Sequence, residues 1–496
     1  MVGLLMAGID GARQLCVIGA AQRTERGGNA PEPLVSWEHR AREAAAGVDH
    51  VLPQIDSLQV VYCQSWPYDD PAGRLAAALG AAPRHQLYSG IGGTTPQELI
   101  NQTAEAMQRG ELDLALICSG EALATVRAAK KAGQRLPWSH RKPSPFPWEP
   151  PHPSELAHDV LQAWETFPLW DTARRARLGA SLAADAAEAA AMMAAMSVVA
   201  ERNPHAWRPK ALDAATIGTV TADNRYVGWP YTKHEVAVMD VDMSAALLFA
   251  TREKADALGV PDDQRLYLSG WAYAEDPASI AARADMSRSA AMSVVGRHAL
   301  ARAGVELGDI GAFDLYSCFP SSLRLACDAL CLAVDDARGL TITGGLPYAG
   351  GPASGYMMHP IADAFTGPGR PAERTLVTGV GMHMAKHVAA VWSSTPGAAS
   401  ASTTLEQPAL QAEVDADQPC RDLLTAWAGP ATVLAYTVAH GRDGDPQQGL
   451  LVLDTGAGRA LARVHDPDLL AEAESAELVG RAVQVTTDGK RNEARW

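Results

Sequence analysis

Two stretches of this chain alternate short apolar segments with segments of helical periodicity, and this alternation constrains the fold most strongly. In the first stretch, expected strands at 15–21, 57–63 and 113–118 are separated by expected helices. Strands that are apolar throughout and separated by helices are typical of an α/β sheet covered on both faces. A second stretch, 265–380, repeats the same order of strand, turn and helix. We therefore expect an internally duplicated α/β fold, although no repeat is visible residue by residue.

The segment between the two stretches follows a different pattern. Seven prolines between positions 136 and 153 exclude regular structure over most of that range. Helical periodicity follows at 156–165, 170–177 and 182–202. We interpret 126–235 as a largely helical insertion. No uninterrupted apolar run of about 18 residues occurs, so we expect no membrane span.

The C-terminal part of the chain changes to a β pattern. Residues 396–411 are rich in Ala, Ser, Thr and Pro, which is typical of a linker. After Trp427 come four short strand patterns, with an expected helix at 467–477 before the last of them. A small barrel of about 80 residues of the oligonucleotide/oligosaccharide-binding (OB) type fits this order. The shape of such a barrel does not by itself name a ligand.

The charge and the cysteines of the chain exclude several classes of protein. Lys and Arg number 42 and Asp and Glu number 57, which gives a net charge of −15. An acidic chain has no general field that attracts a phosphate backbone, so we expect no nucleic-acid partner. The seven cysteines are scattered without a CxxC pair, so we expect reduced thiols, no zinc ribbon and a cytoplasmic location. The N-terminus lacks the positive region of a signal peptide.

Five segments in a fixed order carry a resemblance to a known superfamily. They are 88–97 (YSGIGGTTPQ), 116–122 (LICSGEA), 316–319 (YSCF), 344–352 (GGLPYAGGP) and 375–381 (TLVTGVG). Their order and spacing resemble the thiolase superfamily over roughly residues 12–395. With the barrel that follows, the chain resembles the actinobacterial thiolase-like type 1 proteins, which are commonly labelled acetyl-CoA acetyltransferases.

The resemblance implies a domain organisation. A duplicated thiolase fold with α/β/α/β/α layers would consist of an N-terminal half at 12–268, which contains the insertion, and a C-terminal half at 269–395. The linker at 396–411 would then lead to an OB-like β domain at 412–496.

The sequence departs from the thiolase pattern at each customary catalytic position. Thiolases hold there a nucleophilic cysteine, a histidine, an asparagine or histidine, and a second cysteine, where this chain has Gly93 or Gly92, Gly351, Tyr316, and Val377 or Thr378. Thr94 or Thr95 offers a hydroxyl in the first segment, without an adjacent base to activate it.

The resemblance implies a protein that handles acyl-CoA thioesters, with an acyltransferase as the first interpretation. One alternative is a carbon–carbon lyase or aldolase on CoA thioesters, in which Tyr316, Tyr348 or His359 acts as acid or base. Another is a non-catalytic subunit that binds CoA or acyl groups. No cofactor is expected beyond the CoA thioester, which would be the substrate or the ligand.

Four side chains are the candidates for chemistry in the absence of the usual set. Cys318 and Tyr316 lie at a strand end before a helix, where a thiol can be activated, although both also fit a packed core. His359 follows the glycine-rich loop and could act as a base or cap a helix. His383 and His387 would share one face of a helix, and His383 would face the cleft. Without a third ligand, we expect no metal.

One basic segment is the best candidate for binding CoA. From 127 to 142 the chain has no Asp or Glu. The basic side chains of this segment are Arg127, Lys130, Lys131, Arg135, Arg141 and Lys142. In thiolases the inserted domain lies over the CoA moiety, so these side chains could contact its phosphates, or they could form a solvated helix face.

Two further features belong to the expected binding site. Gly350 and Gly351 would bring backbone N–H groups close to a thioester, or would form a tight connection. Trp138, Phe146 and Trp148 could cover an adenine or pack the proline-rich loop onto the body. We expect a monomer or homodimer, with the C-terminal β domain as a possible docking site for a protein partner.

Overall fold

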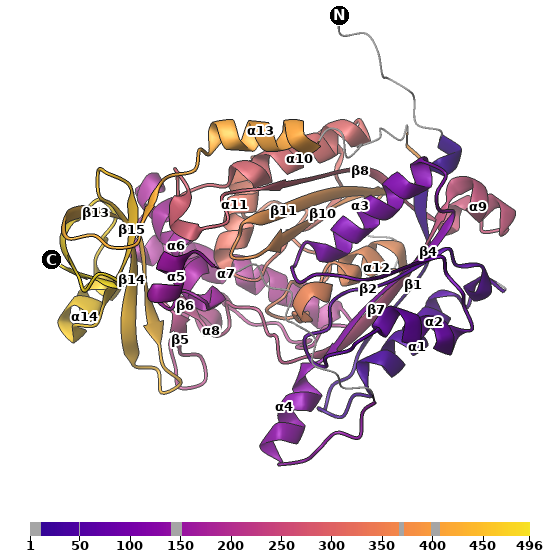
Figure 1. The fold of residues 1–496 in the computed structure, drawn as a ribbon, viewed down its shortest axis with the longest axis horizontal. Helices are drawn as coiled ribbons and strands as arrows, with labels where there is room; N and C mark the ends of the chain where they lie inside the picture. The colour runs from indigo at the N-terminus through magenta and orange to yellow at the C-terminus, as the bar shows by residue number, and fades with distance from the viewer. Residues whose placement is uncertain (1–10, 49, 140–150, 367–371, 398–406) are drawn as a thin grey trace, which may run out of the picture.

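The computed structural model describes residues 11–48, 50–139, 151–366, 372–397 and 407–496 (Figure 1). Its central element is a nine-stranded sheet with the order β3-β2-β4-β7-β1-β8-β11-β10-β9. The N-terminal strands are β1 (Leu15–Thr24), β2 (Ser57–Val60), β3 (His85–Tyr88), β4 (Leu114–Ala122) and β7 (Asp242–Thr251). The C-terminal strands are β8 (Leu266–Glu275), β9 (Ala312–Asp314), β10 (Arg374–Gly381) and β11 (Lys386–Ser393).

The strand directions confirm the predicted duplication. From the centre outward, β1 pairs antiparallel with β7, β7 antiparallel with β4, and β4 parallel with β2. On the other side, β8 pairs antiparallel with β11, β11 antiparallel with β10, and β10 parallel with β9. The two halves meet where β1 pairs with β8. The same sequence of strand directions thus occurs twice, without residue-level similarity.

Helices cover the sheet in layers. One face of the N-terminal half is covered by α1 (Pro33–Ala44) and α2 (Pro71–Leu79), and their apolar side chains share a core with β2 and β4. Two helices contact both halves, α3 (Thr95–Gln108) and α12 (Met358–Thr366). The C-terminal half is packed against α10 (Ala290–Ala303) and α11 (Pro320–Leu330), and α9 (Arg252–Ala257) follows β7.

The predicted insertion is largely helical. It contains α4 (Leu123–Lys131), α5 (Pro153–Ala157), α6 (Ala163–Leu178), α7 (Leu182–Arg202) and α8 (Ala214–Gly218). Within the described part of the chain, only α7 is long and apolar enough to cross a membrane, with 39% of its apolar window buried. Because Met193 and Met196 of α7 lie in the main hydrophobic core, the helix packs as part of the globular body. In Figure 1, α4 projects from the body, away from the other helices of the insertion.

The C-terminal strands close into a small barrel, as predicted. They are β13 (Gly429–His440), β14 (Pro446–Asp454), β15 (Arg459–Val464), β16 (Ala482–Thr487) and β17 (Asn492–Arg495). Their pairing runs β13-β14-β15-β17-β16 and returns to β13, with α14 (Pro467–Ser475) before β16. The short strand β12 (Leu423–Leu424) pairs with β15. Figure 1 shows the barrel at one end of the molecule, beside α5 and α6.

Two contacts tie the barrel to the rest of the chain. The insertion contributes a hairpin, β5 (Tyr226–Gly228) and β6 (Tyr231–Thr232), and β5 extends the barrel sheet by pairing with β13. Helix α13 (Gln407–Asp417) occupies the end of the predicted linker and contacts α10 and β8. Residues 398–406 of that linker lie outside the described residues.

Candidate active site

The turn that replaces the nucleophile loop lies between β3 and α3. A Cβ atom added to Gly93 would lie 2.2 Å from the carbonyl oxygen of Val380 and 2.4 Å from the Tyr316 hydroxyl oxygen. Real Cβ atoms do not approach other atoms so closely. At Gly93 the space of a side chain is therefore filled from both sides, by a tyrosine of the C-terminal half and by the backbone of β10. At Gly92, the alternative position, a Cβ would lie 3.2 Å from Thr95 Oγ1, on a backbone with a φ of +156°. The neighbouring Thr94 hydroxyl is buried and has no hydrogen-bond partner among the described residues.

Tyr316 is held in this place by its backbone and its ring. Its N–H donates to Thr378 Oγ1 at 2.9 Å, which fixes it to β10. Its ring meets the ring of Tyr356 edge-on, with centroids 5.5 Å apart. Burial raises the pKa of the Tyr316 hydroxyl, with the nearby Cys318 thiol acting in the same direction. Tyr316 therefore stays protonated at neutral pH and can only donate its proton to a group that becomes basic.

A buried carboxylate beneath Tyr316 was missed by the sequence analysis. Asp314 Oδ1 accepts a hydrogen bond from Tyr356 Oη at 2.9 Å, and Oδ2 accepts from the hydroxyls of Thr341 at 2.8 Å and Thr343 at 2.9 Å. Burial raises the pKa of Asp314. This network fixes the Tyr356 ring that supports Tyr316. Its one sequence signal was an acidic residue at the end of an apolar strand, two positions before Tyr316.

Cys318 is a buried thiol in this fold. Its Sγ lies 3.7 Å from Ser322 Oγ, at the start of α11. Burial raises the pKa of the thiol to about 12, and its hydrogen bond with Ser322 lowers it by less. A thiol with this pKa is not ionised at neutral pH, and thiolate character is what makes cysteine a nucleophile. The position before a helix does not activate it.

His359 is a neutral, buried side chain at the start of α12. Its Nδ1 is hydrogen-bonded to Gln22 Oε1 at 2.8 Å, and Gln22 Nε2 donates to Asp363 Oδ1 at 2.5 Å. Its Nε2 has no partner among the described residues. Burial lowers the pKa of the ring to about 3, and the charge of His205 acts in the same direction.

The pH dependence of stability tests this burial. The folded protein does not protonate His359 at pH 5, whereas the unfolded chain, with an ordinary pKa near 6.5, does. Because the folded-state pKa of His359 is lowered, the free energy of unfolding decreases as the pH falls below about 6.5, the pKa of the unfolded chain. Between pH 8 and pH 5 we expect wild type to lose about 2 kcal/mol more unfolding free energy than His359→Asn. Denaturant titrations at both pH values measure this difference; equal losses would contradict a neutral His359.

The prediction that His383 and His387 share a helix face is wrong. Met382, His383 and Met384 have positive φ angles and form the turn between β10 and β11, while His387 lies on β11. The turn is closed by strand pairing from Gly381 to Lys386. His383 Nδ1 is hydrogen-bonded to Thr166 Oγ1 of α6 at 2.9 Å. Burial lowers the pKa of His383 to about 4.

Helix α4 and the residues that follow it carry the described part of the basic segment. Arg127 forms an ion pair with Asp240, whereas Lys130, Lys131 and Arg135 are exposed and form no ion pair among the described residues. Arg141 and Lys142 lie outside the described residues, as do Phe146 and Trp148. Trp138 packs edge-on against Trp66, with centroids 5.1 Å apart, so this aromatic holds the segment to the body.

The glycine-rich loop is a close-packed connection in this fold. Gly350 has a φ of +113°, and a Cβ there would lie 2.5 Å from Met243 Sδ. The Gly351 N–H donates to Val238 O at 2.9 Å, so it is not free for a ligand.

The structure brings together only part of the predicted catalytic set. Tyr316 and Cys318 share a strand end, and Tyr316 reaches the Gly93 turn. Within the described part of the chain, no hydrogen bond links Tyr316, Cys318, His359 or His383 to one another, and no three metal-ligating side chains cluster. The arrangement offers a buried proton donor beside a blocked nucleophile position.

Comparison with solved structures identifies the family. A monomeric SCP2-thiolase-like protein type 1 from Mycobacterium smegmatis is 32% identical, with a TM-score of 0.83, over 98% of this chain and 99% of its own. The present chain belongs to this family. Residues 409–490 of this thiolase-like type 1 protein match the family described as "thiolase-like protein type 1 additional C-terminal domain". No curated protein sequence matches the chain.

Two more distant structures share the fold alone with this thiolase-like type 1 protein. The Ltp2-ChsH2(DUF35) aldolase is 16% identical over 77% of this chain and 98% of its own, with a TM-score of 0.60. An acetyl-CoA acetyltransferase from Syntrophomonas wolfei is 14% identical over 77% of this chain and 99% of its own, with a TM-score of 0.54.

Proposed function

We propose that this protein binds acyl-CoA thioesters, in the cytoplasm and as a monomer, without forming a covalent acyl-enzyme. The observation that carries the proposal is the filled space at Gly93, where neither a thiol nor any other side chain fits. Covalent acyl transfer needs a nucleophile whose pKa is lowered or that lies beside a base. Cys318, the candidate thiol two residues after Tyr316, is kept protonated by burial. The fold is retained while the covalent step is lost.

The exposed cations of α4 support an anionic ligand. Lys130 and Lys131 lie at the end of the helix and Arg135 follows shortly after it, and none of the three forms an ion pair among the described residues. Basic side chains without acidic neighbours attract phosphate groups. The whole chain has a net charge of −15, so a local cluster of unpaired basic side chains differs from the rest of the sequence. The phosphates of CoA are the anionic groups that an acyl-CoA ligand would bring there.

Two measurements on the full chain test this function. After incubation with a panel of acyl-CoAs, we expect intact mass spectrometry to show no acyl adduct, while calorimetry detects binding. The double variant Lys130→Glu/Lys131→Glu should weaken that binding about 10-fold, or about 1.4 kcal/mol. The effect should shrink at high salt, because exposed charges are screened.

A matched charge reversal on the barrel serves as the control. Arg442→Glu/Lys490→Glu makes the same change in net charge at exposed positions of another domain, and it should leave the affinity unchanged. A stable adduct on any cysteine would contradict the non-covalent proposal. Equal weakening by both double variants would show that net charge, and not α4, governs binding.

A second function is favoured by the direction of the Tyr316 hydroxyl, which occupies the space of the missing nucleophile. A protonated phenol there suits a carbon–carbon lyase that acts on a 3-hydroxyacyl-CoA. In that reaction the 3-hydroxyl proton passes to solvent, the C2–C3 bond breaks and a carbonyl product leaves. The electron pair remains on the thioester enolate, and Tyr316 protonates its C2 carbon. The phenolate then regains a proton from solvent.

A further inference from the structure

An arginine of the insertion lies on the glycine-rich loop, beside the candidate site. The Arg208 N–H donates to Tyr348 O at 2.8 Å, and the Trp207 N–H donates to Ala349 O at 2.8 Å. The same loop is bound to the strand end that carries Tyr316, because the Leu346 N–H donates to Ser317 Oγ at 3.1 Å. The segment that follows α7 is thereby fixed against the loop, and Arg208 has a defined place.

Arg208 differs from the fully buried arginines of this protein. Arg175, Arg283, Arg324 and Arg463 each have a carboxylate within 4.0 Å. Arg208 is partly buried, and within the described part of the chain its guanidinium has neither an ion pair nor a hydrogen bond. This burial lowers the pKa of Arg208. Removing a cation from water without a partner destabilises the folded state. No ion pair or hydrogen bond of the Arg208 guanidinium among the described residues compensates for this loss.

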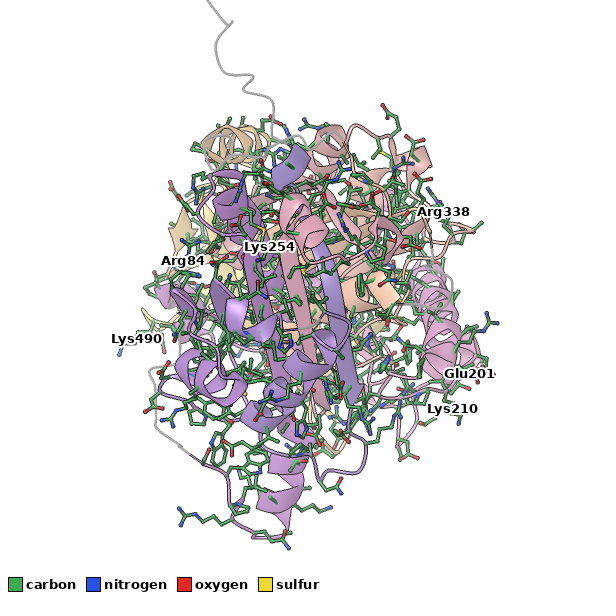
Figure 2. The ribbon with its side chains drawn as sticks, turned by 90° about the vertical axis from the view of Figure 1, so that its right-hand side faces the viewer. Arg84, Glu201, Lys210, Lys254, Arg338 and Lys490 are labelled. Carbon is green, nitrogen blue, oxygen red and sulfur yellow. The ribbon has the colours of Figure 1, made fainter. Side chains whose placement is uncertain are left out.

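The surroundings of Arg208 hold an unpartnered hydroxyl, several cations and one buried carboxylate, Glu235. Tyr348 is 1% exposed, and its hydroxyl has no hydrogen-bond partner in the described part of the chain. Burial raises the pKa of this hydroxyl, the charge of Glu235 acts in the same direction, and the charge of Arg208 lowers it by less. Burial lowers the pKa of His234, the positive charges of Arg208, Lys233 and Lys210 lower it further, and the charge of Asp223 acts in the opposite direction. Figure 2 shows Lys210 at the rim of the molecule, on the side opposite Lys490.

We propose that Arg208, with Tyr348 and the rim lysines Lys210 and Lys233, forms a binding site for an anionic oxygen group, a phosphate or a carboxylate. A guanidinium fork and a phenol hydroxyl are donors that match such oxygens. This inference rests on the proposed function, because we take the anionic oxygen group to be part of an acyl-CoA. It is either a phosphate of the CoA part or a carboxylate at the end of the acyl chain. The position beside the glycine-rich loop fits both sources.

Arg208→Gln tests the site, because glutamine keeps polar atoms and removes the charge. Inorganic pyrophosphate should raise the melting temperature of wild type and not that of the variant. If the anion is a CoA phosphate, Arg208→Gln should bind CoA at least 10-fold more weakly and pantetheine equally. If it is a carboxylate, the variant should lose a preference of wild type for succinyl-CoA over butyryl-CoA. Arg442→Gln, an exposed arginine of the barrel, is the matched control.

Stability without ligand separates a binding role from a structural one. Since the Arg208 charge has no partner, Arg208→Gln should melt at the wild-type temperature or above. A clearly lower melting temperature, or unchanged binding of pyrophosphate, CoA and succinyl-CoA, would overturn the site. If wild type binds pyrophosphate through Arg208 but binds no acyl-CoA, the site stands and the proposed function fails.

Discussion

Gly93→Ala should be among the most destabilising single substitutions in this protein. The added Cβ would lie 2.2 Å from the Val380 carbonyl oxygen, which belongs to strand β10 and cannot move without disturbing its pairing with β11. It would also meet the Tyr316 hydroxyl at 2.4 Å. Overpacking of a core typically costs 1–3 kcal/mol, and a contact with backbone lies at the upper end. We expect a loss of about 3 kcal/mol of unfolding free energy in denaturant titrations.

A glycine in the same turn provides the control. A Cβ on Gly90 would meet nothing within 4 Å, so Gly90→Ala should change stability by less than about 0.5 kcal/mol. If Gly93→Ala were equally tolerated, the filled site would be wrong. Gly93→Cys, which restores the thiolase residue type, should be destabilised in the same way and show no acyl adduct.

The blocked turn explains why restoring one residue type would not restore thiolase chemistry. The resemblance to thiolases puts Gly93 or Gly92 where those proteins have a cysteine, which predicts a missing nucleophile. It could not show that Tyr316 and Val380 fill the space, because these residues come from the other half of the duplicated fold. The difference from a thiolase site therefore involves residues of both halves of the fold. A cysteine placed at Gly93 in the N-terminal half would collide with Tyr316 and Val380 of the C-terminal half.

Local patterns predicted the architecture of the core well. Apolar strands alternating with helices indicated the covered sheet, and the two stretches indicated a duplication that the strand directions confirm. These signals are local, because a strand that is buried on both faces consists mainly of apolar residues. The barrel followed from short strands with turns between them in the same way. The hairpin β5–β6 was not expected, since its pairing with β13 joins segments far apart in the chain.

The errors at the site also have physical causes. The spacing of His383 and His387 suits a helix, but a four-residue turn between paired strands satisfies the backbone at this point instead. Asp314 was passed over because a single acidic residue after an apolar strand has no local pattern, and its partners Thr341 and Tyr356 are distant in sequence. The exposed lysines of α4 could be predicted because a basic run without acidic residues is a local signal. The ion pair of Arg127 with Asp240 could not be predicted, because the two residues are far apart in the sequence.

Tyr316→Phe should separate binding from bond cleavage. The substitution removes the phenol proton donor at the Gly93 turn and keeps the ring that packs on Tyr356. General acids typically contribute 10²–10⁴-fold to a rate, so the cleavage of a 3-hydroxyacyl-CoA to a carbonyl compound should fall at least about 100-fold. The affinity for CoA should be unchanged, because the hydroxyl lies at the reacting end of the proposed ligand. Single-turnover assays of carbonyl release, together with calorimetry, measure both quantities.

Tyr267→Phe is the matched control for this prediction. It also removes one tyrosine hydroxyl. Tyr267 lies at the start of β8, in a different part of the sheet from the Gly93 turn, and its hydroxyl donates to Asp262 in the turn before the strand. Cleavage by this variant should remain at the wild-type rate.

If Tyr316→Phe cleaves as fast as wild type, Tyr316 is not the acid. If wild type binds acyl-CoA and cleaves none of the 3-hydroxyacyl-CoAs, the lyase is ruled out and binding without turnover stands. Because the buried phenol can act only as a donor, a rise of the rate with pH through the neutral range would also contradict its role.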